Sequence, residues 1–420
     1  MKKTSLFALL FVLLTALAGA PASAEEITWE QCVREALANN PSLSARRLAI
    51  EQNRHTYLSG YNAFMPNISL SHSVSRSGGD GSDASTSWRA GISATETLFN
   101  LKTFSSIRSS KLGYEKAEAD YRAESASLRL TLYSALVNLL FAQERLAAQE
   151  KVTELRGQNA RLIKLKYESG MESRGNMMHA DALHEVALAD TAKARRSLET
   201  ARRDLLAAMG TSGYRPLTVR GELSSPEYEL DTRDLRPLIE ASPRIISQRK
   251  SLSVQEERLL SAKYDAAPSL SASQSMSWSG PYEFPDRRSW SLGLSLSVPL
   301  FSNGPTYYLH NTASARAALK AAGESLRGTV LDLENNILGY YDEFLNAVQT
   351  AAAHVRILEA SEERYKESQI KYMAGKMSFL DLETIEQNLV SARLNQLEYL
   401  KNANTRKLAV ENLLGVGLGD

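Results

Sequence analysis

The sequence predicts an α+β membrane protein in which one unit, made of two β-strands and long coiled-coil helices, occurs twice. Three observations lead to this prediction: an N-terminal apolar run typical of an export signal, strand-length segments in which apolar residues alternate with serine, and very long stretches without proline. Strand side chains point alternately to two faces, whereas helical side chains repeat every 3.6 residues, so these patterns separate strands from helices.

The composition excludes several classes of protein. The chain has 420 residues with 49 Lys+Arg against 48 Asp+Glu, and this balance argues against nucleic-acid binding. A single cysteine excludes a disulfide framework and a cysteine-based metal knuckle. There is no GxSxG or HExxH motif and no paired Cys/His spacing, so we expect no enzyme activity, no cofactor and no metal site.

Residues 1–24 have the three parts of a secretory signal peptide. Lys2 and Lys3 give a positive start, Leu6–Leu17 is apolar, and Ala22-Ser23-Ala24 provides a cleavage site. No cysteine follows directly, so we expect no lipid anchor. Further along, no apolar run approaches the ~18–20 residues of a membrane helix, so the exported protein is either soluble or crosses a membrane as a β-barrel.

Internal similarities indicate that the mature chain is a duplication. The motif Lys-Tyr-x-x-Gly occurs at 166–170 and again at 371–375, and a Leu-Phe pair occurs at 98–99 and again at 300–301. We therefore expect two repeats joined by a short linker. The predicted ranges are 25–212 for repeat 1, 213–229 for the linker and 230–420 for repeat 2.

Each repeat is expected to contain a helix, a pair of strands, a very long helix, a turn and a last helix. The first helices are predicted at 29–62 and 233–265, and the strand pairs at 66–98 and 268–300. The long helix of repeat 1 covers about 102–167, roughly 100 Å of helix. Its apolar residues recur in steps of four and three, which is typical of coiled coils. These residues are Leu128, Leu132, Ala135, Leu139, Ala142 and Leu146, and in repeat 2 Leu333, Ile337, Tyr340, Phe344, Ala347 and Ala351.

The alternating segments favour a membrane β-barrel. One face of each is apolar and the other carries small hydroxylated residues, whereas the outward faces of soluble sandwiches usually carry Lys and Glu. Trp88, Trp278 and Trp290 lie in these segments, and we interpret them as an aromatic girdle in contact with outer-membrane lipid. The alternative is a soluble β-hairpin domain with serine-rich strands.

The number of predicted strands requires an oligomer. Four strands cannot close a barrel, and open strand edges are not tolerated in lipid. Each chain is therefore expected to supply part of a shared wall. Because the serine faces lack bulky side chains, they predict a water-filled lumen.

Together these features resemble the TolC-like outer-membrane efflux protein family. The resemblance covers essentially the whole mature chain. It rests on Trp29-x-x-Cys-Val-x-x-Ala-Leu-x-x-Asn-Pro, on the Leu-Phe pairs, on the two Lys-Tyr-x-x-Gly turns, and on the segment from Arg364-Tyr365 to Phe379-Leu380-Asp381-Leu382.

The resemblance implies a homotrimer. Four strands from each of three chains would form one 12-stranded outer-membrane β-barrel, standing on an α-helical barrel that extends through the periplasm. It also implies an exit duct of a tripartite efflux pump or a type I secretion system. The implied partners are a periplasmic adaptor (a membrane fusion protein) and an inner-membrane transporter of RND or ABC type.

Acidic residues after the second Lys-Tyr-x-x-Gly turn form the predicted periplasmic gate. The resemblance implies a gate built from acids at the position of Asp381, and Glu383 and Glu386 belong to the same acidic group. We expect Tyr372, beside it, to act as a supporting group. In a trimer, an inward-facing acid occurs three times around one axis, where it attracts cations and closes the tip. The alternative is a solvated, charged helix face.

The two turns themselves are predicted to dock the adaptor, because they are short, contain glycine and end long coiled coils. The docking residues are Gly170, Met171, Glu172, Ser173, Gly375, Lys376, Met377 and Ser378. Repeat 1 has Gly175 and Asn176 where repeat 2 has Leu380 and Asp381, so the two tips are expected to differ.

Two other functions compete with the exit duct. One is an outer-membrane component specialised for metal-ion efflux, which the sequence Met177-Met178-His179 with His184 suggests. Residues five apart on a helix lie about 140° apart, however, so these two histidines cannot share one ligand shell. The other is a soluble periplasmic coiled-coil scaffold.

Overall fold

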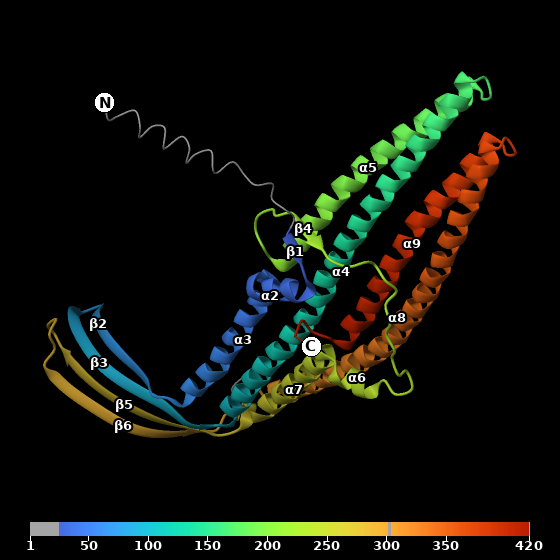
Figure 1. The fold of residues 1–420 in the computed structure, drawn as a ribbon. Helices are drawn as coiled ribbons and strands as arrows, with labels where there is room; N and C mark the ends of the chain where they lie inside the picture. Colours follow the sequence, from blue (N-terminus) through green and yellow to red (C-terminus); the bar gives the residue numbers. More distant parts are fainter. Residues whose placement is uncertain (1–24, 301–303, 420) are drawn as a thin grey trace, which may run out of the picture. The chain divides into compact units, whose positions relative to one another are not determined.

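The same order of helices and strands occurs twice along the chain (Figure 1). The computed structural model describes residues 25–300 and 304–419, so the predicted signal peptide at 1–24 and Phe301 of the second Leu-Phe pair lie outside the described residues. The first series is α2 (Trp29–Asn39), α3 (Pro41–Gly60), η1 (Tyr61–Phe64), β2 (Asn67–Gly79), β3 (Ser82–Asn100), α4 (Leu101–Glu168) and α5 (Arg174–Met209).

Between the two series lies β4 (Leu217–Val219), which pairs in parallel with β1 (Glu25–Ile27), the strand that precedes the first series. The second series is α6 (Arg236–Ala241), α7 (Pro243–Lys263), η2 (Tyr264–Ala266), β5 (Ser269–Gly280), β6 (Arg287–Ser297), α8 (Tyr307–Met373) and α9 (Phe379–Leu414).

The first helix of each series is divided by a proline, so the predicted continuous helices at 29–62 and 233–265 are wrong. Pro41 begins α3 and Pro243 begins α7. Proline has no N–H to donate and forces the residue before it out of the helical region. Accordingly Asn40 is extended, with φ −68° and ψ 122°, and its side-chain oxygen accepts from the N–H of Leu43 at the start of the next helix.

The chain divides into two compact units, and within each unit the residues mainly contact one another. The helical unit contains the residues up to Ser44 together with Glu124–Leu235 and Glu334–Asp420, and the strand unit contains Ala45–Ala123 and Arg236–Leu333. The long helices α4 and α8 contribute residues to both units.

The strand unit holds one antiparallel sheet in the order β2-β3-β5-β6. Its register places serine beside serine across the strands: Ser69 pairs with Ser93, Ser93 with Ser275, and Ser275 with Ser291. The hydroxyl groups bond to each other across the strands, for example Ser69 to Ser93 at 2.8 Å and Ser277 to Ser289 at 2.8 Å. We call this side of the sheet the hydroxyl face.

The opposite side of the sheet, the apolar face, is exposed. Leu70 is 84% exposed and Trp290 is 74% exposed. The other large apolar residues exposed on it are Ile68, Val74, Ile92, Leu292, Leu294 and Leu296. An exposed apolar patch of this extent marks an interface with lipid or with another protein.

The helical unit has a heptad core. Of the predicted seam of α4, Leu128, Leu132, Ala135, Leu139 and Ala142 are buried and Leu146 is half-buried. Ile337, Phe344, Ala347 and Ala351 of α8 are buried too, as is Leu333 at the end of the strand unit. Tyr340 is exposed instead.

Within the described residues, α4 is the one helix whose length and composition would suit a membrane span. Half of its most apolar segment is buried, however, as in the core helix of a coiled coil.

Candidate functional site

The candidate site lies in the helical unit, where the hairpins α4–α5 and α8–α9 turn (Figure 1). Both turns use the same backbone device. Gly170 and Gly375 have φ of +75° and +71°, a left-handed conformation that glycine adopts without strain. Ser173 and Ser378 then cap the next helices, each accepting a hydrogen bond from a backbone N–H three residues ahead. The two turns therefore start from matched geometry.

One hydrogen bond joins the two turns directly. Tyr372, at the end of α8, is 2% exposed, and its hydroxyl donates to a carboxylate oxygen of Glu172 over 2.8 Å. Lys166 of α4 donates to the Tyr372 carbonyl over 2.8 Å, and its ammonium lies 3.9 Å from the centre of the Tyr372 ring. The Lys and Tyr of the two repeated motifs therefore contact each other across the hairpins.

The Glu172 carboxylate is held in its ionised form. Its partial burial would raise the pKa, but hydrogen bonds from Asn176, Tyr372 and the Ser173 backbone, together with the nearby Lys166, outweigh it and lower the pKa of Glu172 below its usual value. Burial, and then the hydrogen bond to Glu172, raise the pKa of the Tyr372 phenol. The phenol thus stays protonated and donates to a carboxylate, which makes the bond charge-assisted.

Asp381 occupies a different place from Tyr372. Its side chain is exposed at the start of α9, where its backbone N–H and one carboxylate oxygen both bond to the Ser378 hydroxyl, the oxygen over 2.6 Å. The structure therefore attaches Asp381 to its own helix cap and attaches Tyr372 to Glu172. Within one chain the carboxylate of Asp381 remains open to solvent.

Glu383 contacts the first hairpin. One of its carboxylate oxygens lies 2.7 Å from Nε2 of His179 on α5, and the imidazole meets the Phe379 ring edge-on. His179 thus contributes to a link between hairpins. Within the described residues, no group of three or more His, Cys, Asp or Glu side chains is placed to hold a metal ion.

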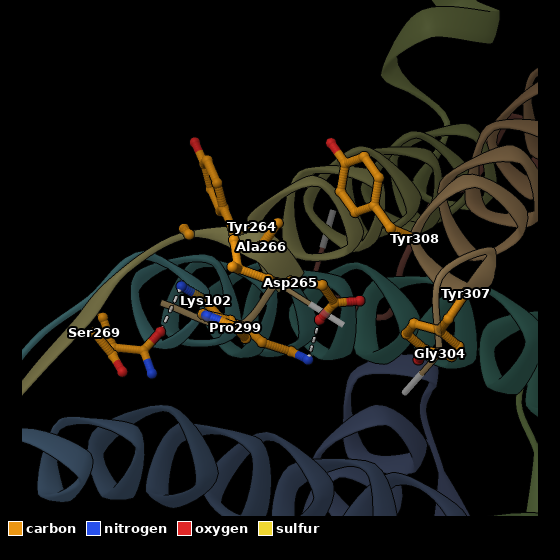
Figure 2. A pocket seen from close by; sticks show the side chains of 12 residues that line it. Lys102, Tyr264, Asp265, Ala266, Ser269, Pro299, Gly304, Tyr307 and Tyr308 are labelled. Atoms are coloured by element: carbon orange, nitrogen blue, oxygen red, sulfur yellow. Dashed lines mark hydrogen bonds and ion pairs between the residues drawn. The ribbon is translucent and has the colours of Figure 1, made fainter. Parts of the chain in front are cut away.

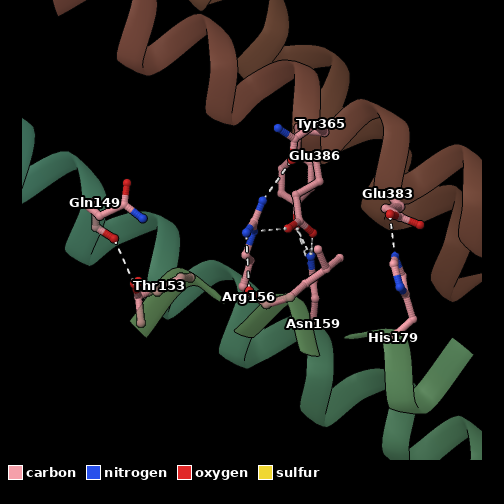
Figure 3. A network of polar contacts seen from close by, with 11 residues as sticks. Gln149, Thr153, Arg156, Asn159, His179, Tyr365, Glu383 and Glu386 are labelled. Carbon is pink, nitrogen blue, oxygen red and sulfur yellow. Dashed lines mark hydrogen bonds and ion pairs between the residues drawn. The ribbon is translucent and has the colours of Figure 1, made fainter. Parts of the chain in front are cut away.

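Glu386 is buried between the hairpins, as Figure 3 shows. Nε of Arg156 lies 3.4 Å from one of its carboxylate oxygens, and Asn159 donates a short hydrogen bond to the other. The amide of Asn159 also donates to the Tyr365 hydroxyl over 2.9 Å. Burial raises the pKa of Glu386, against the opposing effects of Asn159 and Arg156. Glu386 thus belongs to a buried polar network rather than to an open acidic face.

The four predicted gate residues therefore make three different kinds of contact. Tyr372 bonds to Glu172, and Asp381 bonds to the cap of its own helix. Glu383 and Glu386, both on α9, contact residues of the first hairpin. Sequence reasoning placed Glu172 with the docking turns and did not identify Lys166, Arg156 or Asn159. The repeated Lys-Tyr-x-x-Gly motif was a usable signal for Lys166. No comparable local signal marks Arg156, whose partner Glu386 lies in the other repeat.

The predicted girdle residues lie together on the apolar face of the strand unit. Trp278 pairs with Ala90 and Trp88 with Val74, and Trp88 stacks on the ring of His72. Trp290 pairs with Met276. All three tryptophans lie in the halves of the strands that are nearer the β-hairpin turns. That they contact lipid stays a prediction.

A second polar cluster fixes the opposite ends of the strands, where they continue into helices (Figure 2). The Lys102 ammonium lies 2.5 Å from a carboxylate oxygen of Asp265, whose other oxygen accepts from Asn311 over 2.6 Å. Tyr264, Tyr307 and Tyr308 line the same pocket. These contacts join α4, η2 and α8 at the base of the sheet.

The chain matches a known protein family over most of its length. The family model described as "Outer membrane efflux protein" matches residues 32–211 and 236–416. The chain is similar to the alkaline protease secretion protein AprF of Pseudomonas aeruginosa, with 25% identity over 387 residues, covering 87% of this chain and 79% of AprF. It is similar to the cobalt-zinc-cadmium resistance protein CzcC of Cupriavidus metallidurans, with 24% identity over 310 residues, covering 72% of this chain and 71% of CzcC.

The fold also matches solved structures. A crystal structure of CusC superposes with a TM-score of 0.83 at 17% identity and covers 93% of both chains. This likeness concerns the fold, and it confirms the predicted combination of a small sheet with long helical hairpins.

Proposed function

Since the chain belongs to the outer membrane efflux protein family, we propose that three copies of it form the exit duct of a tripartite efflux pump or a type I secretion system. The protein is located in the outer membrane, as its family is. In the proposed duct the four-stranded sheets form the wall of one 12-stranded barrel, and the helical hairpins extend into the periplasm. The duct has no catalytic chemistry of its own and is driven by its partners.

One observation carries the proposal: the sheet has an exposed apolar face, a hydroxyl face, and two unpaired edges. In the described part of the chain β2 and β6 are each paired on one side only. An unpaired edge in lipid leaves backbone N–H and C=O groups without partners, which costs several kcal/mol per group. Pairing β6 of one chain with β2 of the next removes both edges, turns the apolar face to lipid, and encloses the hydroxyl face.

Contacts between the two helical hairpins near their turns support a closed resting state of the proposed duct. The bond from Tyr372 to Glu172, the His179–Glu383 pair and the buried Arg156–Glu386 pair all hold α8–α9 against α4–α5 within one chain. Asp381 remains exposed next to these links. In the trimer we assign it to the ring of acids that binds cations at the tip.

The proposed partners are a periplasmic adaptor and an inner-membrane transporter of RND or ABC type. The two turns suit an adaptor because they are exposed, matched in backbone geometry and rich in apolar side chains. Met171 and Leu380 are each 69% exposed. Of the two relatives, one is named for alkaline protease secretion and the other for cobalt-zinc-cadmium resistance, so the proposal here names the duct and not its cargo.

Cysteine cross-linking tests the proposed barrel. Leu70→Cys on β2 and Leu294→Cys on β6 place thiols on the two open edges, and neighbouring positions on β6 sample the register between chains. The native Cys32 is fully buried, so it does not compete. We expect a covalent ladder that ends at three chains, and no ladder from Leu70→Cys alone. A ladder that ends at two chains, continues beyond three, or fails in every register would contradict the trimer.

A further inference from the structure

Within the regularly paired part of the sheet, a single row carries charge on the hydroxyl face. Its members are cross-strand neighbours on all four strands: Ser73 pairs with Arg89, Arg89 with Ser279, and Ser279 with Arg287. The row therefore has two arginines, one on β3 and one on β6, with a serine between them. Because neighbouring strands lie about 4.8 Å apart, the two arginine backbones are separated by roughly 10 Å.

The rest of the hydroxyl face is uncharged. Where the four strands are paired in regular register, its remaining residues are Ser, Thr, Gly and Asn. Arg89 and Arg287 are both exposed, and neither has an ion-pair partner in the part of the chain that the structure describes. Within the regularly paired strands, the row is thus a positive charge without an acidic neighbour on the same face.

The chemistry of the row fits an oxyanion. Guanidinium groups bind phosphate or carboxylate oxygens through paired N–H donors, and long arginine side chains starting about 10 Å apart can reach one polyvalent anion between them. The hydroxyls of Ser73 and Ser279 provide further donors beside them. Clefts lined by one sign of charge concentrate ions of the opposite sign, so closure of the sheet around this face strengthens the attraction.

We propose that the row formed by Ser73, Arg89, Ser279 and Arg287 is an anion-binding ring on the duct wall, which takes solutes that carry phosphate groups. This inference rests on the proposed function, because the hydroxyl face must be the lumen and the trimer must bring three rows together. Each chain then contributes two guanidinium groups to the ring. The ring gives the duct an affinity for anionic cargo that the neutral serine rows cannot supply.

The sheet provides a matched control. Arg76 on β2 and Arg288 on β6 lie on the apolar face, because Arg76 pairs with Thr86 and Arg288 with Trp278. They belong to the same sheet and carry the same charge as the ring arginines. Replacing them changes the net charge of the protein equally but leaves the hydroxyl face intact.

Isothermal titration calorimetry of the detergent-extracted protein with inorganic triphosphate tests the ring. The measurement does not require the helical tip to be open, because it detects binding and not transport. We expect wild-type protein and Arg76→Ser/Arg288→Ser to bind alike, and Arg89→Ser/Arg287→Ser to bind at least about tenfold more weakly, as for the loss of charged hydrogen bonds. Arg89→Lys/Arg287→Lys keeps the charge and should retain intermediate affinity, and binding should weaken as salt rises.

Three outcomes would overturn the ring. Undiminished binding by Arg89→Ser/Arg287→Ser shows that these arginines do not hold the anion, and equal losses in the two pairs show attraction to net charge alone. No triphosphate binding by wild-type protein also excludes it. Size measurement on the same samples separates this inference from the proposed function: a trimer without triphosphate binding contradicts only the ring, whereas a monomer contradicts the duct itself.

Discussion

The hydroxyl of Tyr372 donates to the carboxylate of Glu172 over 2.8 Å and so connects the end of α8 with the turn between α4 and α5. The two residues are 200 positions apart and belong to different repeats. Lys166 completes the contact from α4 by bonding the Tyr372 backbone and lying over its ring. The link lies within one chain, so it can hold the two hairpins together in each protomer independently of its neighbours.

Tyr372→Phe should loosen this link while keeping the buried ring. The variant removes one hydrogen bond to an ionised group, worth about 1.5–3 kcal/mol, so resting conductance in planar bilayers should rise roughly tenfold or more. Tyr167→Phe is the matched control, because Tyr167 occupies the same motif position in repeat 1 and is exposed. Equal conductance in wild-type protein and both variants would exclude a role of the hydroxyl in closing the tip.

Arg156→Met should destabilise the helical unit in a pH-dependent way. The substitution leaves the buried Glu386 without its cation, and breaking such a pair costs about 3 kcal/mol. Burial already raises the pKa of Glu386, and a raised pKa favours the protonated native state. The deficit in thermal unfolding should therefore be large at neutral and alkaline pH and shrink as the pH falls.

The double variant Arg156→Met/Glu386→Met controls for lost packing. It removes both charges, so it should recover much of the stability at neutral pH and lose the pH dependence. A deficit of the single variant that is the same at every pH would mean that the Glu386 carboxylate is not responsible.

Asp381→Ala should weaken block by divalent cations added from the periplasmic side and should lower cation preference. In the proposed trimer, three exposed Asp381 carboxylates around one axis would attract cations, whereas the Glu383 carboxylate is already paired with His179. Glu383→Ala should therefore do less. Bilayer recordings that show full block in Asp381→Ala and lost block in Glu383→Ala would assign the ring to the other carboxylate.

Gly375→Val should abolish export through the docking turn without lowering the amount of trimer. The φ of +71° at Gly375 is strained for any side chain and worst for a β-branched one, although a Cβ there would meet no neighbouring atom. Gly375→Asn is the matched control, since asparagine tolerates this conformation. Export assays should show activity in the asparagine variant and none in the valine variant. Full export in both variants would contradict a role of this turn in docking the adaptor.

Local patterns were sufficient for the elements of the fold. The serine alternation predicted four strands, and the structure pairs those serines, as in Ser275 with Ser291. The 4-3 apolar pattern predicted the core of α4, where Leu132 and Leu139 are fully buried. Pro41 and Pro243 divide the first helices because proline restricts the residue before it, and the apolar periodicity alone does not show this break.

The candidate site was less predictable because its contacts cross between repeats. The carboxylate of Glu386 looked like the others after the second turn, yet it is buried against Arg156, which is more than two hundred residues away. No helical or strand period encodes such a pair. The motif that contains Lys166 and Tyr372 was repeated, but a repeat shows that two segments are alike and not that they touch.

Every step of the proposed function depends on three chains closing one barrel, and the mass of the detergent-extracted complex measures this directly. Native mass spectrometry, with circular dichroism of the same sample, should give a single species of three chains that retains its β content and dissociates only on heating. A stable monomer with native β content would contradict the proposed barrel, because within the described residues one chain leaves an edge of β2 and an edge of β6 unpaired.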